Sequence, residues 1–250
     1  MGNNRGSSMT VTRRRPMIEL YGLAFLLGAI GTACGEDAKP AFPVMAPIEQ
    51  YLEASASAEI ALARTAAPTS ISGDASVLVL GKHGYETAVK GKNGFVCLVW
   101  RSWAVGSGAT GFDDAEFWNP KLRIPICYNP AGARTVLPAY LEETKWALAG
   151  ASKAEMKDRT RAALASNRIA TPEPGALAFM MGGEGGDAVG HHWPPHVMMF
   201  LAHTEVADWG AGLHGVPISA DQGEPEPTIT TFNVLVPLFS DGTPATQGPH

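Results

Sequence analysis

The clearest pattern in the chain is a series of short apolar segments separated by turns that contain glycine. Apolar segments at 77–80, 85–89 and 95–100 are separated by Gly81-Lys-His-Gly84 and by Lys90-Gly-Lys-Asn-Gly94. Asn-Gly suits the positive φ angles of a tight hairpin, and apolar runs bounded by such turns are typical of strands. We therefore expect a three-stranded antiparallel meander in this part of the chain.

Three other segments carry helical patterns. Residues 47–66 are rich in alanine and lie between prolines, and residues 131–148 repeat large apolar side chains. Residues 153–166 follow Ser152-Lys-Ala-Glu155, a sequence that fits a capping box. Residues 104–130 contain many turn signals and are expected to form loops.

Three more apolar runs, at 176–181, 196–203 and 229–239, complete the pattern and predict strands. The strands and helices do not alternate regularly along the chain. This order predicts an α+β fold, in which an antiparallel sheet of about six strands packs with about three helices.

The N-terminal segment differs from the rest. Arg13-Arg-Arg15 precedes an apolar run at 21–30, which is followed by Gly31-Thr-Ala33. Basic, apolar and small residues in that order are the layout of a secretory signal, and the run is shorter than the roughly 20 residues that span a bilayer. We expect residues 1–34 to be a signal peptide, 35–46 a linker and 47–250 a single domain.

Cys34 directly follows the small residues and resembles the cysteine of a bacterial lipobox. Cleavage there would leave either a lipid-anchored Cys34 or a soluble chain cut nearby, and both alternatives stay open. Either product would be exported to the periplasm, the cell envelope or the extracellular space.

Composition narrows the function classes. The 250 residues are 45% hydrophobic and 17% charged, with a formal net charge of −5. Removing residues 1–33 leaves 15 basic and 23 acidic residues, a net charge of −8. A chain this acidic lacks the basic surface that nucleic acids and anionic membranes need, so membrane contact is expected only through an N-terminal lipid.

Two cysteines, Cys97 and Cys127, remain if Cys34 is set apart. In an oxidising compartment a cysteine pair favours a disulfide. Sequence spacing alone leaves two buried free thiols as the alternative.

Histidines supply the chemical lead. Five of the seven fall within residues 191–214: His191, His192, His196, His203 and His214. Imidazole is a frequent ligand of transition metals. Strand alternation separates His196 from His203, so the expected metal set is His191 or His192 with His196, completed by Glu184 or Asp187. The metal would be Zn, Fe or Cu; in the alternative, the histidines have only a structural role.

The stretches Val77–Cys97 and Gly190–Phe200 resemble a group of uncharacterised exported bacterial proteins. The resemblance implies export and carries no activity or site residues.

Two hypotheses follow. In the first, the chain is an exported or lipid-anchored soluble domain that binds a small ligand or a partner. In the second, it is a metal-dependent enzyme, perhaps a hydrolase, with His191, His192 and His196 as ligands and Glu184 as a catalytic base.

Overall fold

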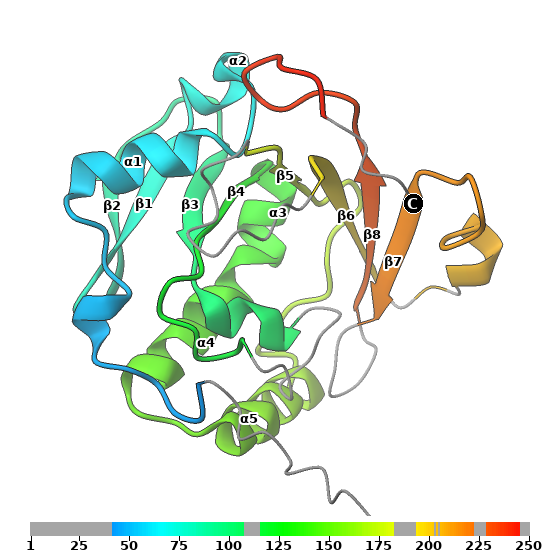
Figure 1. Ribbon diagram of the computed structural model, residues 1–250. Helices are drawn as coiled ribbons and strands as arrows, with labels where there is room; N and C mark the ends of the chain where they lie inside the picture. Colours follow the sequence, from blue (N-terminus) through cyan, green and yellow to red (C-terminus); the bar gives the residue numbers. More distant parts are fainter. Residues whose placement is uncertain are drawn as a thin grey trace, which may run out of the picture. The chain divides into compact units, whose positions relative to one another are not determined.

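The structure is a computed structural model that describes residues 42–107, 116–182, 194–202, 204, 206–222 and 229–245. The chain divides into two units, Met1–Ala38 and Lys39–His250, and every described residue belongs to the second. Within the described part, eight strands form one sheet in the order β2-β1-β3-β4-β5-β6-β8-β7 (Figure 1). The strands are β1 (Ser76–Gly81), β2 (Gly84–Val89), β3 (Val96–Trp100), β4 (Ile124–Tyr128), β5 (Leu177–Met180), β6 (His196–Ala202), β7 (Ile218–Gln222) and β8 (Ile229–Leu235).

The predicted mixed α and β class is confirmed, with more strands and helices than expected. The α-helices are α1 (Ala56–Arg64), α2 (Thr69–Ser72), α3 (Pro130–Thr135), α4 (Leu137–Leu148) and α5 (Lys153–Ala165). Short 3-10 helices are η1 (Ile48–Gln50), η2 (Ser102–Ser107) and η3 (Val206–Trp209). All six predicted strands coincide with observed strands to within a few residues, and β4 and β7 are additional.

Capping and proline explain where the helices begin and end. The capping box of α5 is present, with Ser152 and Glu155 bonded in both directions. Residues 47–66 form η1 and α1 rather than one helix, because α1 starts only where the Ser55 side chain accepts a hydrogen bond from Ala58 N. Residues 131–148 divide into α3 and α4, since Pro138 lacks the N–H that would bond to the Arg134 carbonyl.

The expected three-stranded meander is wrong. A meander would pair β3 with β2. Instead, β3 pairs in parallel with β1, through Ser76–Val96 and Val77–Cys97, and β2 lies on the other side of β1 at the edge of the sheet. The connection after β2 crosses the start of β1: Gly91 N donates to Ser76 Oγ, at 2.9 Å, and Ser76 N donates to Phe95 O, at 2.9 Å. A Cβ atom on Gly91 would lie 2.2 Å from Ser76 N, so this crossing requires glycine.

Strand β4 lies in the centre of the sheet although residues 104–130 were expected to form loops. Pro125 obscures this strand in the sequence, because proline is normally excluded from central strands. The Cα atoms of Cys97 and Cys127 are 3.9 Å apart, as in a pair without backbone hydrogen bonds. Pro125 lies opposite Val99, two residues further on, so its missing N–H removes no bond to β3.

Side chains from alternate positions of the central strands fill two cores. Cys97, Val99 and Cys127 pack with Ala63 of α1 in one core. Leu98, Ile126 and Tyr128 pack with Tyr140 of α4 in the other, larger core. No helix in the described part is both long enough and apolar enough to cross a membrane.

Candidate functional site

Most of the predicted metal site lies outside the described residues: Glu184, His191 and His192, as does the predicted lipidation site Cys34. His196 is described and begins β6, half-buried, with its ring Nδ1 2.8 Å from Pro194 O. Among the described ranges, no group of three or more His, Cys, Asp or Glu side chains is placed to hold a metal ion. The metal site therefore stays a prediction.

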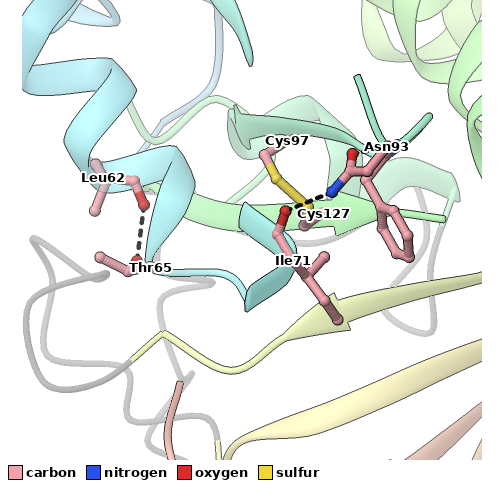
Figure 2. The surroundings of a disulfide bond; sticks show 7 residues. Leu62, Thr65, Ile71, Asn93, Cys97 and Cys127 are labelled. Atoms are coloured by element: carbon pink, nitrogen blue, oxygen red, sulfur yellow. Dashed lines mark hydrogen bonds between the residues drawn. A yellow bond between two sulfur atoms is a disulfide. The ribbon is translucent and has the colours of Figure 1, made fainter. Parts of the chain in front are cut away.

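The predicted cysteine pair is brought together. Cys97 of β3 and Cys127 of β4 face each other in register and form a disulfide (Figure 2). Both side chains are fully buried. Nearby, Asn93 Nδ2 donates to Ile71 O at 2.8 Å and thus fixes the loop before β3 to α2. Burial on this scale gives the pair a structural role, because no substrate thiol could reach either sulfur.

A buried polar cluster lies where α1, β3 and α4 meet. The Arg101 guanidinium donates to Glu59 Oε1 at 2.9 Å, to Tyr51 O at 2.6 Å and to Val99 O at 2.5 Å. The Tyr140 hydroxyl accepts from Arg101 N at 2.8 Å. Burial raises the Tyr140 pKa to about 12, against the opposing effect of its hydrogen bonds. These buried groups satisfy one another's hydrogen-bonding capacity. Arg101 and Glu59, which are far apart in the sequence, therefore stabilise the fold and are not available to contact a ligand.

The strongest candidate for contact with a ligand lies at the other end of the sheet. A groove of about 550 Å³ runs along the end of β7 and β8, and we call it the edge groove. It is lined by Gly212, Leu213, His214, Gly215, Val216, Pro217, Ile218, Ser219, Leu235, Val236 and Pro237. Its volume falls within the range of about 300 to 1,000 Å³ that is usual for small-molecule sites.

Three glycines shape the loop that forms one wall of the edge groove. Gly210, Gly212 and Gly215 have φ angles of 65°, 76° and 78°, which favour glycine. Gly212 N donates to Ile218 O at 2.9 Å, so the loop turns back onto β7. Leu213 and His214, which lie between Gly212 and Gly215, are exposed, whereas Ala211 is half-buried.

Two large apolar side chains that line the edge groove are exposed. The described residues include five exposed side chains of this kind, namely Val44, Trp209, Leu213, Val216 and Leu238. Leu213 is 63% exposed and Val216 is 37% exposed, and both line the groove. Trp209 lies 4.8 Å from the Phe232 ring of β8, measured between ring centroids. Exposed apolar side chains that share one groove, as Leu213 and Val216 do, mark a candidate surface for binding a ligand or partner.

The chemistry of the lining is simple. It contains no lysine, arginine, aspartate or glutamate, and His214 supplies its one ionisable side chain. The edge groove can therefore take an uncharged apolar group and offer an imidazole, a serine hydroxyl and backbone groups for hydrogen bonds. Sequence reasoning missed this site, although the alternation of glycine with Leu213 and Val216 was a usable signal.

A smaller cavity of about 300 Å³ lies beside Arg123. The Arg123 guanidinium is already engaged by the Glu53 carboxylate and by backbone carbonyls, including Pro120 O at 2.8 Å. It therefore has no remaining role as an anion-binding group, and this cavity is the weaker candidate.

Comparisons of the chain with protein families, with curated proteins and with solved structures find no match. The edge groove is thus described by its own geometry alone.

Proposed function

We propose that this chain is an exported or lipid-anchored soluble domain that binds an apolar ligand or partner in the edge groove. The observation that carries the proposal is the uncharged lining combined with exposed Leu213 and Val216. Single exposed apolar side chains are common on protein surfaces, but exposed apolar side chains that share one uncharged groove are typical of a binding site.

Export is part of this proposal and is supported by the cysteines. A buried disulfide between Cys97 and Cys127 suits an oxidising compartment. Mass spectrometry of the mature N-terminus tests export and separates its two forms. A diacylglycerol mass on Cys34 indicates a lipid anchor, an unmodified new N-terminus indicates simple cleavage, and an intact residue 1 removes the signal-peptide proposal.

Binding of the neutral fluorophore N-phenyl-1-naphthylamine tests the edge groove. Two valines provide matched variants, because Val216 lines the groove and Val44, which is 72% exposed, does not. We expect Val216→Ser to weaken binding at least about fivefold, since an exposed-to-buried valine contributes roughly 1 kcal/mol or more. Val44→Ser should leave binding unchanged. Equal effects of the two variants, or no binding by the wild-type protein, would overturn the proposal.

The metal-dependent enzyme remains a second candidate because of one contact. His196 Nδ1 lies 2.8 Å from Pro194 O, and a histidine that donates Nδ1–H to a carbonyl presents Nε2 as its ligand nitrogen. Metal analysis of the purified protein tests this candidate. Stoichiometric Zn, Fe or Cu that is lost in the His192→Ala/His196→Ala variant supports it, and metal-free protein with an unchanged fold removes it.

A further inference from the structure

Strand β7 forms one edge of the sheet, with β8 as its strand neighbour in the described part of the chain. Leu235 N donates to Pro217 O at 2.9 Å, so Pro217 and Leu235 form a hydrogen-bonded pair. The register then alternates along β7. Ser219 and Asp221 direct their backbone groups toward β8, whereas Ile218, Ala220 and Gln222 direct theirs away from the sheet.

The outward backbone groups are partly used by the protein itself. Ile218 O accepts from Gly212 N at 2.9 Å, which confirms the outward direction of this residue. The N–H and C=O groups of Ala220 and Gln222 continue the same edge. Such groups are a template for another strand, because they can bond to an extended backbone in the way that a sheet neighbour does.

The edge and the edge groove are continuous. Ile218 and Ser219 belong to β7 and also line the groove. Because Gly212 already occupies the outward carbonyl of Ile218, an added strand would pair with Ala220 and Gln222. Its continuation toward Ile218 would enter the groove that Leu213 and Val216 line. Hydrogen bonds between the backbones would supply affinity, and the groove would select which side chains the added strand carries. In strand addition, main-chain bonds normally give affinity and side-chain pockets give specificity.

The charge pattern decides what kind of chain fits. The lining has no charged side chain that could pair with a charged residue, so a charged side chain entering the groove would lose hydration without compensation. A second copy of this protein fits less well. Each copy carries a net charge of −5, so two copies repel each other, whereas an uncharged segment does not meet this repulsion.

We propose that β7 and the edge groove bind an extended, uncharged peptide segment of a partner protein, which adds to the sheet beyond β7. This inference rests on the proposed function and specifies its occupant.

The test begins with an array of uncharged eight-residue peptides in which apolar and polar residues alternate. The mature wild-type protein is titrated with the member that binds most tightly and with two N-methylated analogues of it. One analogue is methylated at the odd residues and the other at the even residues. In an extended peptide, either the odd or the even residues direct their N–H groups toward β7. We therefore expect one analogue to bind at least about tenfold more weakly than the parent peptide and the other to bind like the parent.

A variant of the protein provides the second measurement. Ala220→Pro removes an outward N–H without removing a bond to β8, as proline at an edge strand permits. We expect this variant to lose at least about tenfold in peptide affinity and to keep its affinity for N-phenyl-1-naphthylamine, because Ala220 does not line the groove. Asp221→Asn, at a residue whose backbone faces β8 and which does not line the groove, is the control and should bind the peptide normally. If Ala220→Pro fails to fold, the two N-methylated analogues decide alone.

The outcomes separate this inference from the proposed function. Equal binding of both analogues and the parent, or fluorophore binding with no peptide bound by any array member, overturns the strand-addition proposal and leaves the groove proposal standing. Failure of both the fluorophore and the array overturns both.

Discussion

Arg101 Nη2 lies 2.9 Å from Glu59 Oε1, and the two side chains are 0% and 3% exposed. The pair joins α1 to the residue that follows β3, across 42 positions in the sequence. Glu59 Oε1 also accepts from Leu80 N at 3.0 Å, which brings β1 into the same network. One carboxylate therefore links a helix and two strands in the core.

Removal of the Glu59 carboxylate should be strongly destabilising. In Glu59→Ala the Arg101 charge stays buried without its counterion, and we expect a loss of about 3 to 5 kcal/mol in the free energy of unfolding. Urea denaturation measures this change. The matched control is Glu173→Ala, which breaks the solvent-exposed pair with Arg134 and should cost less than about 1 kcal/mol. Similar losses in the two variants would contradict the role assigned to Glu59.

Alkaline pH should unfold the protein through its buried tyrosines. Burial raises the Tyr140 pKa to about 12, whereas the hydroxyl titrates near 10 when unfolded. The native state thus binds more protons than the unfolded state between these values. The stabilising contribution is complete below pH 10 and is lost as the pH rises toward 12, by about 3 kcal/mol for this residue.

Denaturant titrations at several pH values between 9 and 12 measure this loss, and phenolate absorbance reports ionisation. Burial also raises the pKa of Tyr85 and of Tyr128 well above the usual range, so their ionisation should accompany unfolding. Tyr140→Phe should show a smaller alkaline decrease than the wild-type protein. A free energy of unfolding that stays constant across this pH range would count against the buried positions of these hydroxyls.

The disulfide should contribute measurably to stability. It closes a loop with a sequence separation of 30, which corresponds to about 3 to 4 kcal/mol in the chain-entropy model. We expect the Cys97→Ser/Cys127→Ser variant to be less stable by about this amount in urea. Alkylation of denatured protein checks the bond itself, because prior reduction should add two alkyl groups. The same number of groups with and without reduction would instead indicate free thiols.

Local signals in the sequence predicted the local structure well. The capping box at Ser152 fixed the start of α5, and the apolar runs at 77–80 and 85–89 identified β1 and β2. These elements depend on neighbours within a few residues.

Long-range pairing was not predictable in the same way. The meander failed because Gly91 lets the chain cross the start of β1, a contact that a hairpin pattern does not reveal. Strand β4 was not predicted because Pro125 argues against a central strand. The N–H that proline lacks would cost a hydrogen bond to β3 only if Pro125 occupied a hydrogen-bonded position, and the register places it opposite Val99 at a position without such a bond. The pairing of Arg101 with Glu59 joins residues that no sequence spacing connects.

In the candidate sites, too, residue content could be read from the sequence, whereas the arrangement of residues in space could not. Histidine content directed attention to residues 191–203, of which His196 lies on a described strand, whereas His191 and His192 lie outside the described residues. The predicted base Glu184 also lies outside them. The edge groove depends on three positive φ angles and on which strand ends the sheet, and both are properties of the folded chain.

If the edge groove is the binding surface, a bound ligand perturbs the amide groups that line it. Amide chemical-shift mapping measures this perturbation when isotope-labelled mature protein is titrated with N-phenyl-1-naphthylamine. We predict saturable shifts at residues 212–216, 218–219 and 235–236, with no shift at Val44. Shifts that are absent, or that cluster on another face of the protein, would contradict the account.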